Sequence, residues 1–214
     1  MLKLYYPVKP FIINQRWGEN EACVKDFGTP SQKVVTKKNG VCPVGYEELY
    51  PKFGMVGHNG LDLRAGVQPI YASHAGTVVE KQTVPARGLG LGILSHEQYD
   101  FGTYGIHFAK TRYWHLKSFT KDVGDTVNIG DIIGTSDNTG ASSGNHLHWE
   151  LQLWDKDAGG HPIRYNHPDM IAGTIDPTPY LINVYAKDVH EPISYYEKAL
   201  QLISAILAEL QKPR

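Results

Sequence analysis

The sequence predicts a mainly β fold, in which an antiparallel sheet is followed by a C-terminal amphipathic helix. Between about residues 56 and 153, short β-branched and aromatic runs alternate with Gly or Asp-Asn turns, which is typical of antiparallel strands. The composition agrees, because 22 Gly, 13 Pro and 13 Tyr among 214 residues favour many turns and strands. Residues 193–211 differ, since their apolar side chains recur at helical spacing.

The composition also limits size and function. A chain of 214 residues forms one good-sized domain with small attachments and can bury a sizeable core. The net charge of −1 argues against a nucleic-acid-binding protein, because such proteins carry a clear basic excess. No run reaches the roughly 20 apolar residues of a transmembrane segment, and residues 1–11 lack the features of a signal peptide. We therefore expect synthesis in the cytoplasm without a signal peptide, wherever the protein later acts.

Changes in composition and residue pattern along the chain divide it into three segments. Residues 1–55 form a polar lead-in or insertion that packs on the main domain, residues 56–182 form that domain, and residues 183–214 form a linker and a helix. Within the main domain, GDTVNIGDIIG (124–134) alternates in polarity and is split by Gly-Asp, which indicates a hairpin. A lipoyl-carrier function for this hairpin is excluded, because the turn lacks the lysine that a carrier needs.

The C-terminal helix has one continuous apolar stripe. Its members recur at spacings of four and three residues: Tyr196, Leu200, Ile203, Leu207 and Leu210. Leu202 and Ile206 widen this face, which favours a helix packed on its own domain over a narrow coiled-coil seam. Self-association through residues 193–211, or docking to a partner, is the alternative.

Cys23 and Cys42 lie in the polar N-terminal segment, at a separation that fits no C-x-x-C metal or redox motif. A disulfide between them and a pair of free thiols are equally compatible with the sequence. A bridge would contribute about 3 kcal/mol by the loop-entropy estimate, and it would matter only in an oxidising compartment.

The ten histidines are an unusual number, and histidine is both the commonest metal ligand and the usual proton-transfer group. In GNHLHWELQL, His146 and His148 are two residues apart, so a strand would point both side chains to one face. Apolar residues occupy the opposite face: Leu147, Trp149, Leu151 and Leu153. This arrangement suits a shared metal or substrate, although an exposed face that happens to carry two histidines would look the same.

Two further segments add candidate ligands. In HNGLD, His58 and Asp62 are four residues apart with a glycine between them, so a turn entering a strand can bring them to one ion. His115 lies in a strand-like stretch, TRYWHLKSF, ahead of a polar turn. Each signal is weak alone. Together they supply three N/O ligands of the kind that zinc prefers and further histidines for proton transfer. These are the groups that a zinc hydrolase needs.

The order of HNGLD, YASHAGTVV, YWHL and VGDTVNIGDIIGTSDNTGASSGNHLHWEL resembles the lysostaphin-type, or LytM-like, zinc endopeptidases of peptidase family M23. The resemblance spans roughly residues 56–153, and INQRWGEN before it resembles the segment that precedes this domain in many relatives. A framework of glycines matches as well: Gly57, Gly60, Gly76, Gly124, Gly130, Gly134, Gly140 and Gly144.

The resemblance implies an antiparallel β-sheet groove of the LytM/lysostaphin type. It implies that His58, Asp62 and His148 ligate Zn²⁺ and that His115 and His146 are the catalytic pair, without saying which of the two is the general base. The implied substrate is a peptide of bacterial peptidoglycan, in the stem or the cross-bridge. With no signal peptide, such an enzyme is expected to be a phage or phage-like lysin that is holin-released, virion-borne or injected.

The alternative is a LytM-like module that binds the wall or a partner protein without catalysis, but all five site residues are retained. The stretch from His96 to His115 is longer than the family's compact hairpin, and we expect it to extend one wall of the substrate groove. HEQYD (96–100) is no metal motif, because Asp100 replaces the second histidine of H-E-x-x-H. The remaining histidines are expected to be surface or structural residues: His74, His107, His161, His167 and His190.

Overall fold

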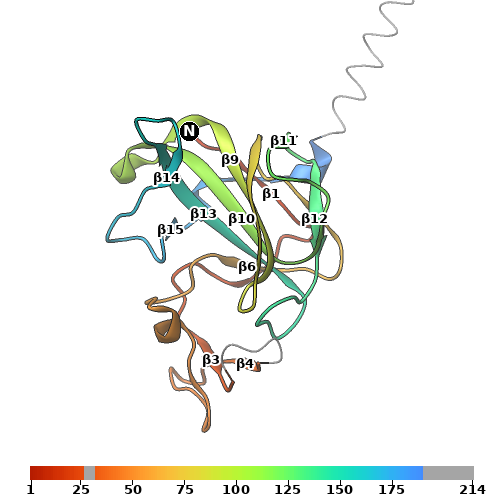
Figure 1. Ribbon diagram of the computed structural model, residues 1–214. Coiled ribbons are helices and arrows are strands. Elements are labelled where there is room, and N and C mark those ends of the chain that lie inside the picture. Colours follow the sequence, from red (N-terminus) through yellow and green to blue (C-terminus); the bar gives the residue numbers. More distant parts are fainter. Residues whose placement is uncertain (27–31, 190–214) are drawn as a thin grey trace, which may run out of the picture.

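The computed structural model describes residues 1–26 and 32–189, and strands dominate this part of the chain (Figure 1). The predicted mainly β, antiparallel fold class is confirmed. The helical elements among the described residues are short 3₁₀ turns: η1 (Tyr50–Phe53), η2 (Gly102–Tyr104), η3 (Thr178–Tyr180) and η4 (Ala186–Asp188). None of the described helices is long and apolar enough to cross a membrane. The helix predicted at residues 193–211 lies outside the described residues.

The main sheet has 11 strands, and its central path runs β11-β8-β9-β10-β13-β6-β2. Its members on this path are β2 (Ile13–Gln15), β6 (Leu61–Arg64), β8 (Gly76–Val84), β9 (Gly88–Asp100), β10 (Ile106–Phe119), β11 (Thr126–Val127) and β13 (His146–Lys156). Four short strands pair beside it: β7 (Pro69–Tyr71), β12 (Ile132–Ser136), β14 (Pro162–Arg164) and β15 (Thr174–Ile175). All of these pairings are antiparallel.

One face of this sheet packs the core. Along β13 the alternate residues are fully buried and join that core: Leu147, Trp149, Leu151 and Leu153. From the N-terminal segment, Leu2, Leu4 and Val8 pack against them. Since strand side chains alternate, the opposite face of β13 carries His146, His148 and Glu150. Burial of the apolar face therefore orients the polar one.

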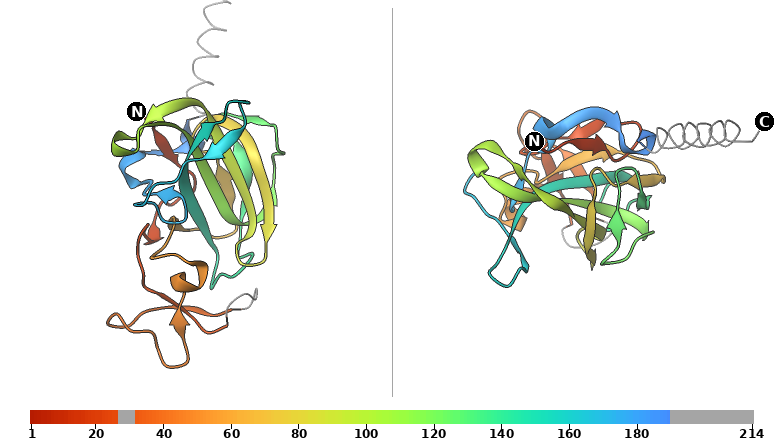
Figure 2. Two further views of the ribbon diagram at one scale, coloured as in Figure 1. Left: turned by 60° about the vertical axis from the view of Figure 1, so that its left-hand side comes forward. Right: turned by 90° about the horizontal axis from the view of Figure 1, so that it is seen from above.

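The two ends of the described chain meet in a small parallel pair, β1 (Leu4–Tyr6) with β16 (Leu181–Tyr185). Figure 2 shows this pair, in red and blue, against one side of the main sheet. The N-terminal segment is thus part of the packing, because β1 and β2 contact elements far along the chain. The domain boundaries at residues 55 and 182 remain predictions.

The segment GDTVNIGDIIG does turn, but it is not a hairpin. β11 pairs with β8, whereas β12 pairs with β10 and β7. The turn between them is held by the amide of Asp131, which donates to the Asn128 carbonyl over 3.1 Å. The alternation of polar and apolar residues correctly indicates where the two strands lie. Which strands they pair with depends on the arrangement of the whole sheet.

The long hairpin of β9 and β10 does not extend the substrate groove, and that expectation is wrong. Its tip, residues 96–107, packs instead beside the far end of β13, where Nδ1 of His107 lies 2.8 Å from Asp155. His115 lies eight residues along β10 from His107, which is about 27 Å of extended strand. In Figure 1 the tip and the start of β6 lie at opposite ends of the sheet.

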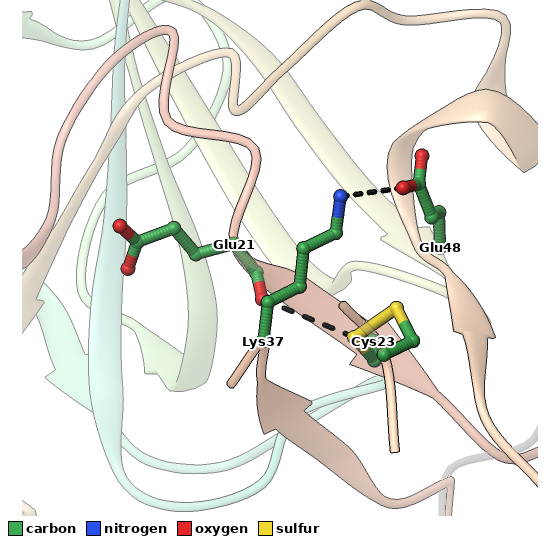
Figure 3. The surroundings of a disulfide bond; sticks show 5 residues. Glu21, Cys23, Lys37 and Glu48 are labelled. Carbon is green, nitrogen blue, oxygen red and sulfur yellow. Dashed lines mark hydrogen bonds and ion pairs between the residues drawn. A yellow bond between two sulfur atoms is a disulfide. The ribbon is translucent and has the colours of Figure 1, made fainter. Parts of the chain in front are cut away.

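A three-stranded sheet projects from the other end of the molecule, in the order β4 (Val34–Thr36), β3 (Ala22–Val24) and β5 (Glu47–Glu48). Cys23 and Cys42 form a disulfide with Cα atoms 5.8 Å apart, which resolves the two alternatives left open by the sequence. Figure 3 shows the bridge next to the backbone of Glu21 and beside the ion pair of Lys37 with Glu48. The disulfide ties β3 to the loop that follows β4. We call residues 19–26 and 32–55 the N-terminal wall.

Candidate active site

Two adjacent strands and one turn bring the predicted metal ligands together. Asp62 of β6 and His148 of β13 are a cross-strand pair, and Oδ1 of Asp62 lies 2.9 Å from Nδ1 of His148. His58 lies in the turn just before β6. Its Nε2 is 2.9 Å from Nδ1 of His148 and 3.2 Å from Oδ1 of Asp62. Within the described residues, this is the one cluster of His, Cys, Asp or Glu with the geometry of a metal site.

The three donor atoms fit a zinc ion. Tetrahedral zinc with ligands at about 2.0–2.2 Å holds neighbouring donor atoms about 3.3–3.5 Å apart. Here the donor atoms lie 2.9–3.2 Å apart, so a shift of a few tenths of an ångström admits the ion. Two imidazoles and one carboxylate are also a donor set that zinc prefers, and they leave a fourth position open.

The hydrogen bonds of His58 select the tautomer that a ligand requires. Its Nδ1 lies 3.1 Å from the carbonyl oxygen of Arg16. A carbonyl only accepts, so Nδ1 carries the proton and donates it, and Nε2 keeps its lone pair. That Nε2 is the atom facing Asp62 and His148.

Charges in this cluster shift the pKa values of its members. Burial alone would raise the pKa of Asp62, but the neighbouring His58 and His146 hold it well below its usual value. Burial would likewise lower the pKa of His148, yet the carboxylates of Asp62 and Glu150 raise it to about 9. Asp62 therefore stays ionised, and the pair of carboxylates favours positive charge at the centre, whether a proton or a metal ion supplies it.

His115 reaches the same site through a β-bulge. Trp114 and His115 together oppose the single residue Gly90 of β9, and His115 adopts a φ of 61°. A bulge breaks the alternation, so two consecutive side chains turn away from the core. Such a left-handed conformation costs about 1–3 kcal/mol in a residue other than glycine, and it is concentrated at functional sites.

His115 and His146 form a pair of rings with centroids 4.5 Å apart. Nδ1 of His115 donates to the Thr139 carbonyl over 2.7 Å, and Nδ1 of His146 donates to the Gly144 carbonyl over 2.8 Å. Each ring therefore keeps Nε2 for the site. Burial, together with the charges of His146 and His148, lowers the pKa of His115 to about 3, so its ring is neutral.

A groove of about 360 Å³ runs past these histidines. One side is the N-terminal wall, which contributes Val34, Val35, Leu49, Tyr50 and Phe53. The other side carries Arg87, Trp114 and the loop at residues 141–145. The lining of the groove is partly apolar and includes all five predicted site residues, which suits the binding of a peptide segment.

Two further residues, Tyr50 and Glu150, lie beside this centre and were not among the predicted site residues. Tyr50 lines the groove with its ring centroid 6.0 Å from that of His58, and burial and the charge of Asp62 raise its pKa. Glu150 is fully buried behind His148. The signal for Glu150 was present, because it shares the strand face of His146 and His148. No sequence signal pointed to Tyr50, since its position depends on how the N-terminal wall packs beside the groove.

The other histidines within the described residues lie away from the centre. His74 and His107 are buried and hydrogen-bonded, which agrees with a structural role. His96 pairs with Thr77, and His161 and His167 pair with nearby aspartates. His190 lies outside the described residues.

Comparisons with known proteins single out the same segment. The family model "Peptidase family M23" matches residues 56–163. The chain is 37% identical over 95 residues to the peptidoglycan DD-endopeptidase ShyA of Vibrio cholerae, a match that covers 44% of this chain and 20% of that protein. It is 35% identical over 95 residues to the glycyl-glycine endopeptidase ALE-1 of Staphylococcus capitis, covering 44% and 24%.

The chain is also similar to solved structures. The catalytic domain of lysostaphin from Staphylococcus simulans is 25% identical with a TM-score of 0.44, over 57% of this chain and 77% of that one. The catalytic domain of the prophage-encoded M23 protein EnpA from Enterococcus faecalis is 20% identical with a TM-score of 0.49, over 82% and 97%. The matches span about a quarter or less of the length of the curated relatives.

Proposed function

Because the chain belongs to peptidase family M23, we propose that it is a zinc-dependent endopeptidase that hydrolyses peptide bonds in bacterial peptidoglycan. The observation that carries the proposal is the convergence of His58, Asp62 and His148 within 3.2 Å, beside a second pair of histidines that also lines the groove. The substrate class rests on the relatives, two of which are named as a peptidoglycan DD-endopeptidase and a glycyl-glycine endopeptidase.

In this proposal His58, Asp62 and His148 hold Zn²⁺. When bound, zinc would supply a Lewis acid and would lower the pKa of its water from about 15.7 towards 7. The protein's own contribution is a preorganised set of ligands, since the tautomer of His58 is already selected by the Arg16 carbonyl.

His115 and His146 handle the protons of the reaction. Each has Nδ1 engaged with a backbone carbonyl, so Nε2 is the atom that meets substrate. One Nε2 accepts the proton of the attacking water and, once protonated, can pass it to the leaving amine, while the other ring donates from Nε2 to the developing oxyanion when it is protonated on both nitrogens. Because both rings are fixed by backbone atoms, they need little reorganisation as the reaction proceeds.

The groove orients the peptide across these groups. Its partly apolar N-terminal wall contacts the substrate, as do Arg87 and the loop at residues 141–145. Whether the bond that is cut belongs to the stem or to the cross-bridge depends on the fit to these walls. A phage or phage-like lysin acting on the wall, through holin release, a virion or injection, remains our proposal for its setting.

The decisive experiment measures metal and activity together. We expect about one zinc per chain and clearing of bacterial cell walls that a chelator abolishes and added zinc restores. Mass spectrometry of fragments released from walls of known cross-link chemistry would then identify the bond. A metal-free protein that leaves walls intact would overturn the proposal. If that protein still bound walls, it would support the non-catalytic LytM-like module.

A further inference from the structure

We propose that Glu150 is a positioning residue that clamps the two halves of the metal site together, and that Arg112 and Glu80 hold it in place. This inference rests on the proposed zinc function. It concerns residues that lie behind the ligands, away from the groove, and that neither the motif nor the groove identifies.

Glu150 contacts the ring nitrogen of His148 that the metal does not use. Oε1 of Glu150 lies 3.2 Å from Nε2 of His148, so Nε2 donates its proton to the carboxylate. The lone pair of Nδ1 is then directed at His58 and Asp62. A carboxylate behind a ligating histidine fixes both its tautomer and its orientation, and it makes the ring a better donor to the metal.

The same oxygen also holds the turn that carries the other ligands. Nδ2 of Asn59 donates to Oε1 of Glu150 over 2.9 Å, and Asn59 directly follows His58. Asn59 and Glu150 are both buried, so water does not compete for this contact. One oxygen atom thus connects β13, which supplies His148, to the turn before β6, which supplies His58 and Asp62.

A buried carboxylate needs compensation for its charge, and a row of residues across the sheet provides it. Nη1 of Arg112 donates to Oε2 of Glu150 over 3.0 Å, and Nη2 of Arg112 donates to Oε1 of Glu80 over 2.7 Å. Lys110 pairs with Glu80 in turn. Both oxygens of Glu150 are therefore engaged, which prevents the carboxylate from rotating away from His148.

Strand register explains how this row forms. Arg112 of β10 pairs with Glu150 of β13 on one side and with Gly92 of β9 on the other, and Gly92 pairs with Glu80 of β8. Glu80 and Arg112 are two strands apart, about 9.5 Å. Because Gly92 has no side chain, Arg112 can reach across it. A Cβ at Gly92 would lie 2.8 Å from Lys110 and 3.1 Å from Glu80.

The proposal predicts a loss of zinc affinity when the charge of Glu150 is removed. In the full-length protein, Glu150→Gln should raise the zinc dissociation constant by about 10- to 100-fold, measured by competition with a chromogenic chelator. Gln152→Met is the matched control, since Gln152 is buried two residues further along the same face and contacts Trp154 rather than a ligand. The control should bind zinc within twofold of wild type. Equal zinc affinity in wild type and Glu150→Gln would overturn the proposal.

A second measurement uses the wild-type protein, so the outcome does not depend on a variant that folds. Nitrogen-15 NMR of the zinc-loaded protein should show the ring proton of His148 on Nε2. A ring proton on Nδ1 would overturn the proposal. At saturating zinc, Glu150→Gln should lower kcat, because Glu150 acts on the metal centre through His148. A wild-type protein that binds no zinc would contradict the proposed function itself, a result distinct from a wild type and variant that bind equally.

Discussion

Asp62 and His148 face each other across β6 and β13, and a carboxylate oxygen of the one lies 2.9 Å from Nδ1 of the other. Side chains of a directly opposed pair are held about 5 Å apart at their Cβ atoms. This register therefore brings the two ligands together without a loop having to close. The site is built on two paired strands of the main sheet, and His58 joins it from the turn that leads into β6.

Substitution of a proposed zinc ligand should have a different effect from substitution of a residue of the proposed catalytic pair. Asp62→Ala and His148→Ala should remove both zinc and activity, because each deletes a donor atom. His115→Ala should retain about one zinc per chain and lose about 10²- to 10⁴-fold in kcat, as expected for loss of proton transfer.

Metal analysis and turnover on the same preparations test this separation. His161→Ala is the control, because His161 is exposed and pairs with Asp157 far from the groove. The assignment is wrong if His115→Ala loses zinc to the same extent as His148→Ala.

Gly60 should tolerate no side chain. A Cβ there would lie 2.6 Å from the backbone oxygen of Trp149 and 2.9 Å from Nε2 of His148. Gly60→Ala should therefore weaken zinc binding and lower the melting temperature, because the turn must move away from β13. Gly66→Ala is the matched control, since nothing lies within 4 Å of its Cβ. Similar zinc affinities in the two variants would contradict this prediction.

The disulfide should support both stability and substrate binding. Replacing Cys23 and Cys42 together by Ser should reduce the free energy of unfolding by about 3 kcal/mol, since the bridge closes a loop with a sequence separation of 19. The N-terminal wall then loses its tether, so KM should rise while zinc content stays at the wild-type level. Denaturant titration and steady-state kinetics measure the two effects. A reductant should reproduce them in wild type and leave the double variant unchanged.

Stability should fall in acid through His74. Burial lowers the pKa of His74 to about 4, with the nearby His96 adding to the effect, while Thr111 and the Ala75 carbonyl satisfy its two nitrogens. The unfolded chain takes up the proton below pH 6.5, and the folded protein resists it until about pH 4. The contribution of neutral His74 to the free energy of unfolding is therefore fully present above pH 6.5. It is lost as the pH falls, by about 3 kcal/mol at pH 4.

The variant His74→Gln isolates this effect, because glutamine keeps a donor and an acceptor but does not titrate. The free energy of unfolding is measured from pH 8 to pH 4 for both proteins, and the difference between the two profiles is compared. That difference should change across pH 6.5 to 4. Parallel profiles would show that His74 contributes nothing to the acid sensitivity.

The sequence alone predicted the strands that carry chemistry, and it did so for a local reason. Alternation in GNHLHWELQL separates an apolar face from a polar one, and that pattern needs no knowledge of the neighbouring strands. The predicted clustering of His58 and Asp62 with His148 depended on recognising the order of the motifs, and the structure places their donor atoms together. Both the mainly β class and the five site residues that line the groove were therefore predictable.

Other features depend on pairing between distant segments, and no local pattern reports them. The bulge opposite Gly90 turns His115 into the site, and the long hairpin extends away from the groove instead of along it. The wall that does line the groove comes from residues before His58, whose polar composition resembled a simple lead-in. The sequence by itself determined the candidate metal ligands and the candidate proton-transfer residues. The tertiary structure decided which partners hold them, because the contacts of Glu150, Tyr50 and the N-terminal wall arise only when the sheet register and the disulfide bring distant parts of the chain together.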